Sequence, residues 1–232
     1  QANASYSFFT DTAFYYFTWN NSVNNSRLIV NNDVNYSSYV ASNYFMFDSR
    51  TYFNYYYIEG EKMLVSGSQT SDPEYVNGEG WYDSPIDLGT SRTRYVNTKN
   101  VYTAGPSAVT YLEVMGASNY SSATPNHHFR LSVAGITLDS LFSGYTRLQM
   151  NMPLSNSALG SVTTGFTMSS INDINSGADR FAIPYLRVVY PHTTNLEGVN
   201  EFVMNINDAS GQTKSYYNFS NFAGGTNAIL YD

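Results

Sequence analysis

The feature that most constrains the fold is a series of short strand-like segments at roughly ten-residue spacing. They lie at residues 95–102, 109–115, 129–134, 146–152, 161–168 and 181–190, and most are bounded by Gly, Pro, Asn or Ser. No capped apolar stripe of helical period lies between them. Such strands bury an apolar face only when two sheets stack about 10 Å apart. We therefore predict an all-β fold, and long connections such as residues 116–128 favour a jelly-roll-like β-sandwich.

The last fifty residues show the clearest alternation. Phe202, Met204 and Ile206 alternate with other residues at the period of a half-buried strand. Residues 207–211 have hairpin-turn composition, and residues 216–222 are expected to form the returning strand. The sequence then stops inside another apolar run, residues 228–231. This ending predicts that the sequence is a piece of a longer protein.

Composition shifts along the chain predict two units. Residues 1–58 are dense in aromatics and form an aromatic-rich β N-terminal segment, with a short strand expected at residues 27–30. Residues 59–232 form the predicted β-sandwich domain, which begins with the acidic, Gly/Ser-rich stretch 59–87. That stretch fits either a connection between two units or a long loop of one domain. Residues 139–142 are expected to open one helical turn.

Composition also limits the compartment and the partners. Charged residues make up 12% of the chain and aromatics 16%, with 22 Tyr, a composition typical of β-sheet proteins outside the cytoplasm. We therefore expect a periplasmic, outer-membrane surface or secreted location. With 11 Lys+Arg and a net charge of -7, the chain offers no basic patch, so no nucleic-acid partner is expected. No apolar run reaches the roughly 20 residues of a membrane span.

The reactive residue types give no catalytic signature. The chain has no cysteine, which excludes disulfides, thiolate zinc sites and a cysteine nucleophile, and it has no Gly-x-Ser-x-Gly. His127 and His128 are expected to be surface residues near a strand start, and His192 a turn residue. Adjacent histidines in an extended strand point to opposite faces, so they do not share one ion. We expect no metal and no cofactor.

Acidic and aromatic side chains leave two further possibilities. Glu59, Glu61, Glu79 and Asp83 could form a carboxylate pair for glycoside hydrolysis, but sequence spacing fixes no geometry, and a solvated loop is favoured. The many aromatics either fill the sheet faces or form a sugar-stacking platform. Trp81 and Tyr82 are the candidate ligand or partner contacts, and no catalytic residue is assigned.

Four segments together resemble one family. Residues 11–20 and 27–28 are similar to the Asp-Thr…Tyr-x-Leu-Thr-Trp-Asn…Arg-Met opening of gingipain-like cysteine peptidases, which include the type IX secretion sortases of Bacteroidetes. Residues 78–82, Gly-Glu-Gly-Trp-Tyr, are similar to the family's Gly-Glu-Gly-Trp-Phe segment. Residues 128–135 are similar to its Val-x-Val-Ala-Gly strand. Residues 205–232 resemble the stretch that leads into the peptidase domain.

The resemblance implies a non-catalytic region that precedes a cysteine peptidase domain. The family's catalytic His and Cys match nothing in this sequence. Phe17 stands where the family has an aliphatic residue, and Tyr82 where it has Phe, so the subfamily stays open. The leading hypothesis is an accessory β-sandwich module, not an enzyme itself, whose partners are the downstream peptidase domain and a protein substrate. The alternative is a carbohydrate-binding surface module with a glycan as its partner.

Overall fold

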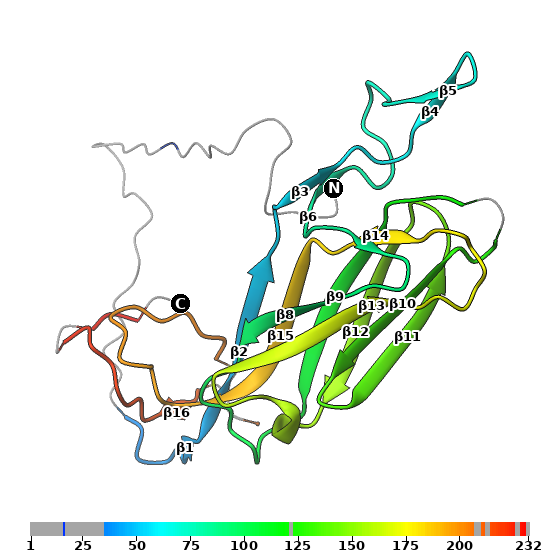
Figure 1. Ribbon diagram of the computed structural model, residues 1–232. Coiled ribbons are helices and arrows are strands. Elements are labelled where there is room, and N and C mark those ends of the chain that lie inside the picture. The colour runs from blue at the N-terminus through cyan, green and yellow to red at the C-terminus, as the bar shows by residue number, and fades with distance from the viewer. Residues whose placement is uncertain are drawn as a thin grey trace.

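The computed structural model describes residues 16, 35–120, 123–206, 210–211, 214–225 and 228–230. Within them the regular structure is β-strand, apart from one 3₁₀ turn at Asn156–Ala158. Two antiparallel sheets lie face to face and enclose the core (Figure 1). The predicted all-β sandwich is confirmed. No helix among the described residues has the length and apolar character to cross a membrane.

The smaller sheet has four strands, in the order β11 (Ile136–Phe142), β10 (His127–Val133), β13 (Thr163–Ser170) and β8 (Ser91–Asn97). Burial alternates strictly along β10, so every second side chain points into the core. Ala134 and Gly135 join β10 to β11 with positive φ angles of 47° and 81°. Two successive residues of this kind make the tight hairpin turn that matches strand twist.

The larger sheet has six strands built around β9 (Ala108–Gly116). On one side β9 pairs with β12 (Arg147–Leu154), and on the other with β15 (Tyr185–Thr193), which pairs in turn with β2 (Tyr44–Tyr52). β14 (Arg180–Ala182) continues the line of β15 beside β9 and also pairs with β7 (Ile86–Asp87). The register shifts by one residue between β14 and β15, at Ile183–Pro184, because proline has no N–H for the ladder.

The core lies between the two sheets. Phe129 of the small sheet packs edge-on against Phe181 of the large sheet, with ring centroids 5.3 Å apart. Phe166 and Met168 from β13 and Leu112 from β9 lie in the same buried cluster. Each aromatic side chain in such a core buries about 150–250 Å². This apolar area supplies the main drive for the two sheets to stack.

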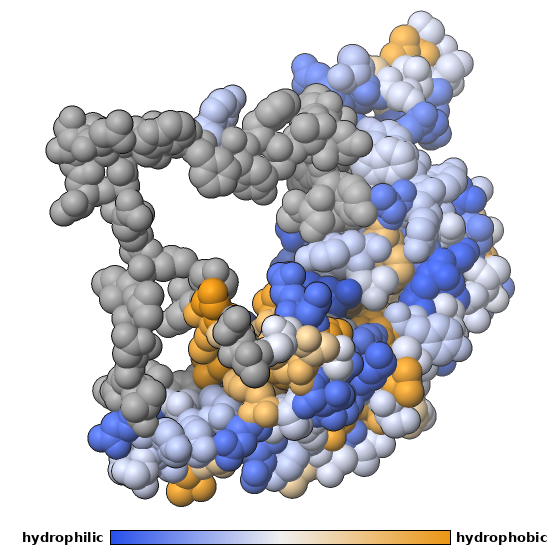
Figure 2. Space-filling view, turned by 90° about the vertical axis from the view of Figure 1, so that its left-hand side faces the viewer, coloured by the Kyte–Doolittle hydropathy of each residue, from blue (hydrophilic) through white to orange (hydrophobic). Residues whose placement is uncertain are grey.

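A short ribbon covers one end of the large sheet's outer face. It pairs β3 (Tyr56–Ile58) with β6 (Gly80–Tyr82), and its Ile58 and Tyr82 pack on Met115 and Ala182 in a second, smaller core. A hairpin of β4 (Met63–Val65) and β5 (Ser68–Thr70) extends beyond it, with exposed apolar side chains on β4 (Figures 1 and 2). At the opposite end, β1 (Ala41–Ser42) pairs in parallel with β16 (Tyr216–Tyr217).

Most of the strands predicted for the sandwich are confirmed, with three corrections. The segment expected at 95–102 ends earlier, at Asn97, and the one expected at 181–190 is divided at Pro184. The helical turn expected at residues 139–142 is wrong, because these residues belong to edge strand β11. The hairpin partner β10 decides their conformation, which the local Asp-Ser signal does not reveal.

The expected strand at 202–206 is also wrong. Phe202 and Met204 are partly buried and their neighbours exposed, as the alternation predicts, but the backbone makes one isolated bridge, between Asn205 and Met46. Of the returning strand, Tyr216–Tyr217 is formed. The strand predicted at 27–30, the resemblance at 11–20 and most of the turn at 207–211 lie outside the described residues. β2 pairs with β15 over nine residues, so the large sheet includes residues from both predicted units, and the division at residue 58 stays a prediction.

Candidate functional site

A pocket of about 330 Å³ lies at one end of the sandwich, where β3 and the loop after it face β14 and the loops that contain Pro85, Ala117 and Tyr145. We call it the tyrosine pocket. Its volume falls in the range of about 300–1,000 Å³ that is usual for small-molecule sites. The side chains that give it chemical character are Tyr56, Tyr57, Glu59, Lys62, Tyr145 and Arg180.

The charges at the tyrosine pocket are paired. Lys62 Nζ lies 2.9 Å from a carboxylate oxygen of Glu59, and Arg180 Nε donates to Asp87 over 2.7 Å. Each pair neutralises its cation while leaving N–H donors and lone pairs at the wall. The pocket therefore offers hydrogen bonds without an excess of either charge, which suits a neutral ligand rich in hydroxyl groups.

Tyrosine rings gather on the ribbon beside the pocket. Tyr55, Tyr56 and Tyr57 are 65%, 46% and 38% exposed, and Tyr75, on the loop before β6, is 56% exposed. Tyr56 and Tyr57 line the pocket together with Tyr145, whereas Tyr55 packs against Phe53. Exposed aromatic side chains at a pocket mark a candidate interaction surface. The Tyr57 hydroxyl donates to the Glu79 carboxylate. Burial and this bond raise the pKa of Tyr57 to about 12, so the phenol stays neutral at physiological pH.

The two residues singled out in the sequence lie on this ribbon with different roles. Trp81 is partly exposed and packs its ring edge-on against Tyr57, with centroids 5.3 Å apart. Tyr82 is fully buried in the small core, and its hydroxyl donates to the backbone carbonyl of Glu79 over 3.3 Å. Burial raises the pKa of Tyr82. Trp81 thus borders the pocket through Tyr57, whereas Tyr82 holds the ribbon on the sheet.

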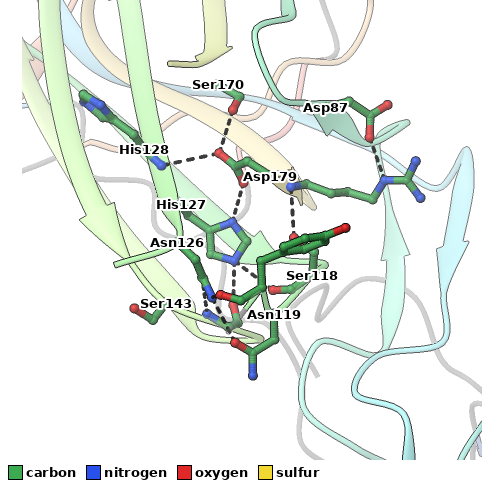
Figure 3. A network of polar contacts seen from close by, with 12 residues as sticks. Asp87, Ser118, Asn119, Asn126, His127, His128, Ser143, Ser170 and Asp179 are labelled. Atoms are coloured by element: carbon green, nitrogen blue, oxygen red, sulfur yellow. Dashed lines mark hydrogen bonds and ion pairs between the residues drawn. The ribbon is translucent and has the colours of Figure 1, made fainter. Parts of the chain in front are cut away.

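A buried polar network joins the segments next to the pocket residues Ala117, Tyr145 and Arg180 (Figure 3). His127 is fully buried at the start of β10, and its Nδ1 contacts the Asp179 carboxylate. Its Nε2 lies 3.0 Å from each of the backbone oxygens of Ser118 and Gly144. Carboxylate and carbonyl oxygens only accept hydrogen bonds, so this geometry favours a ring that donates from both nitrogens. Asp179 also accepts the Ser170 hydroxyl over 2.6 Å.

This network fixes the loops that line the tyrosine pocket. Each of three network members is next in sequence to a pocket residue. Ser118 follows Ala117, Gly144 precedes Tyr145, and Asp179 precedes Arg180. Asn126 ties the same loops: its amide donates to Asn119 Oδ1 over 2.9 Å, and its Oδ1 accepts the Gly144 N–H over 2.9 Å. Buried polar contacts therefore hold the loops of the pocket wall in place, although these loops have no regular secondary structure.

The histidine predictions need correction. His127 is buried in β10 and not at the surface, and His192 is a buried residue of β15 and not a turn residue. The prediction that His127 and His128 point to opposite faces is confirmed, since His128 is partly exposed and contacts Asp173 over 2.7 Å. Local sequence composition did not indicate that His127 is buried, because its partner Asp179 is 52 residues away in the sequence.

The Ser170–Asp179–His127 set does not have the geometry of a hydrolytic triad. A nucleophilic serine must give its proton to the imidazole, whereas the Ser170 hydroxyl donates to the carboxylate. The whole set is also buried, away from any substrate. Within the described residues no group of three or more His, Asp or Glu is placed to hold a metal ion.

Three of the four candidate hydrolytic carboxylates, those of Glu59, Glu79 and Asp83, are held by separate structural partners, and Glu61 is exposed. Glu59 pairs with Lys62, and Glu79 accepts the hydroxyl of Tyr57. Asp83 is an exception to the predicted solvated loop, because it is buried and accepts two hydrogen bonds of 2.6 Å from Arg94. These contacts occupy the three carboxylates with structural partners.

Sequence reasoning did not find Lys62, Tyr145 and Arg180 as pocket residues. Lys62 lies in the acidic stretch, Tyr145 comes from the loop before β12, and Arg180 comes from β14, and the fold brings the last two to the ribbon. The signal available in the sequence was the run Tyr55-Tyr56-Tyr57, next to the acidic stretch. Three consecutive tyrosines cannot all face one core in a strand, so some must be exposed.

Comparisons with known proteins give only distant similarities. No family model matches the sequence, and no curated protein matches it. One similar solved structure is a carbohydrate-binding module, CBM36, in complex with calcium and xylotriose, with 10% identity and a TM-score of 0.32 over 60% of this chain and 98% of that one. Another is the CBM36-1 domain of a multidomain xylanase from the hindgut metagenome of Trinervitermes trinervoides, with 13% identity and a TM-score of 0.32 over 62% of this chain and 95% of that one.

Proposed function

We propose that this chain is a non-catalytic carbohydrate-binding β-sandwich domain, and that the tyrosine pocket takes a neutral glycan. The observation that carries the proposal is the group of exposed tyrosines beside a pocket whose charges are paired. Sugars present flat C–H faces and a rim of hydroxyl groups. Aromatic rings suit the faces, while the paired polar groups of the wall suit the rim.

The pocket is also pre-formed, which favours binding. The ribbon rests on its own small core, and the loops are fixed by the His127 network, so few groups need ordering when a ligand enters. Side-chain and loop ordering is one of the main costs of association. A rigid wall with aromatic side chains therefore supports binding of even a weakly interacting ligand such as a sugar.

The role as an accessory module before a cysteine peptidase stays a prediction, as does the extracytoplasmic location. Carbohydrate binding is compatible with both, because a binding domain can hold a neighbouring domain near its target. The resemblance that motivates the peptidase partner includes residues 78–82, of which Gly80–Tyr82 form strand β6 of the ribbon.

A glycan array followed by calorimetry tests the proposal. We expect the protein to bind a subset of neutral glycans, and Tyr57→Ala to weaken that binding by about tenfold, the usual effect of losing a central aromatic contact. Tyr95→Ala is the matched control, because Tyr95 is 64% exposed on β8 of the other sheet. Failure to bind any neutral glycan, or equal loss in both variants, would contradict the proposal.

A further inference from the structure

The outer face of the six-stranded sheet carries a second group of polar and aromatic side chains, next to the end that the β3–β6 ribbon covers. Every second residue of β2, β15 and β12 points outward here, and the inward ones join the core. Arginines occupy three of these outward positions. We call this surface the arginine face; its main residues are Asp48, Arg50, Tyr52, Arg147, Tyr185 and Arg187.

Two of the arginines share a single carboxylate. Arg50 donates to Asp48 over 2.7 and 2.9 Å, and Arg187 Nε donates to both oxygens of Asp48 over 3.0 Å. Burial alone would raise the pKa of Asp48, but the bonds from Arg50 and Arg187 outweigh it and lower the pKa to about 2. Asp48 is therefore ionised, and the three groups together keep one positive charge.

The third arginine lies over a buried carboxylate. Glu113 of β9 is fully buried, and its Oε2 accepts hydrogen bonds from Arg147 over 2.6 Å and from Gln149 over 3.2 Å. Half of the Arg147 side chain is exposed. Counting both groups, the face carries three guanidinium groups against two carboxylates, in a chain whose net charge is -7. These five groups therefore leave a net charge of +1 on this surface.

Aromatic rings adjoin the guanidinium groups. Tyr52 and Tyr185 are directly opposite in the β2–β15 ladder, with ring centroids 6.2 Å apart, and Arg50 and Arg187 form the next outward pair. The Arg187 guanidinium lies over the Tyr111 ring, 4.6 Å from its centroid. Stacking of this kind fixes the guanidinium plane. The Nε and Nη2 atoms of Arg187 face Asp48, so the Nη1 end of its guanidinium is the part that a ligand anion would contact.

We propose that the arginine face binds polysaccharides that carry carboxylate groups, such as chains of hexuronic acid. The carboxylate lies against the Arg50–Arg187 pair, and the sugar rings lie over Tyr52 and Tyr185. Arginine recognises carboxylates through paired N–H groups, whereas the flat rings favour a sugar over a peptide. The site differs from the tyrosine pocket in place and in ligand charge, so it stands independently of the neutral-glycan function.

Gel retardation by polygalacturonate tests this inference, with neutral mannan and poly-glutamate as comparison polymers. We expect retardation by polygalacturonate alone, weaker at high salt because the contacts are ionic. Arg50→Gln, which leaves Asp48 bonded to Arg187, should weaken binding about tenfold. Asp48→Asn should strengthen it, because the face gains a positive charge. Thermal unfolding of each variant verifies that it is folded.

Arg130→Gln is the matched control, since Arg130 is a similarly exposed, carboxylate-paired arginine on the other sheet. It should leave binding unchanged, as should Tyr57→Ala in the tyrosine pocket. Absence of retardation, equal retardation by poly-glutamate or mannan, or equal loss with Arg130→Gln would overturn the inference. Each of these outcomes leaves the result for neutral glycans at the tyrosine pocket unaffected.

Discussion

Asp179→Ala is expected to lower the free energy of unfolding by about 3–5 kcal/mol, the usual cost of removing one partner of a buried ion pair. The substitution leaves the fully buried His127 ring without its carboxylate, and it leaves the Ser170 hydroxyl without an acceptor. For a chain of this size the melting temperature should fall by about 10 °C. Chemical denaturation with urea and thermal unfolding both measure the change.

The neighbouring histidine provides the matched control. His128 contacts Asp173, whose side chain is 53% exposed, so Asp173→Ala should cost about 0–1 kcal/mol. The Asp179 variant should also lose affinity for neutral glycans while it is still folded at low temperature, because the network holds the pocket loops. Equal stability of the two variants, or unchanged glycan affinity after Asp179→Ala, would show that the network does not hold these loops.

Phe129→Ala should have an effect of similar size, about 3–5 kcal/mol, because it leaves a cavity where the two sheets meet. Phe129 is fully buried on β10, and its ring packs on Phe181 of the opposite sheet. Leu112 and Phe166 border the same core, and their backbone ladders limit how far they can move to fill the space. Urea denaturation measures the loss.

Leu141→Ala, on the adjacent strand β11, is the control for this core substitution. Leu141 is 54% exposed, so the change should stay within about 0.5 kcal/mol. If Phe129→Ala were no more destabilising than Leu141→Ala, the two sheets would not share the core described above. A less cooperative unfolding transition in the Phe129→Ala variant would show that the two sheets unfold separately once this contact is lost.

The strands were predictable where the sequence alternates and where turn residues bound the segment. β9, β10, β12 and β13 meet both conditions, because most of their inward residues are apolar and Gly, Pro or Asn lies near their ends. The strand β11 was not predicted, because Asp139 and Ser140 at its centre resemble the start of a helix. Asp139 in fact pairs across the strands with Arg130.

The candidate sites were less predictable because they are assembled from distant segments. Asp48 and Arg187 are 139 positions apart, and His127 and Asp179 are 52 apart, so no local pattern links them. Charged residues at outward positions of strands were a usable signal for the arginine face. It was not decisive, since the partner strand and the register are needed to place two such residues side by side.

The most direct test of the central claim is an NMR titration that follows the indole N–H of Trp81. The chain has two tryptophans, so the Trp81→Phe variant assigns the resonance. Trp81 packs on Tyr57, which lines the tyrosine pocket. Adding a neutral oligosaccharide selected on the array should shift this resonance until the site is saturated, and Tyr57→Ala should abolish the shift. Binding detected by calorimetry without any shift of the Trp81 resonance would place the sugar elsewhere and contradict the account.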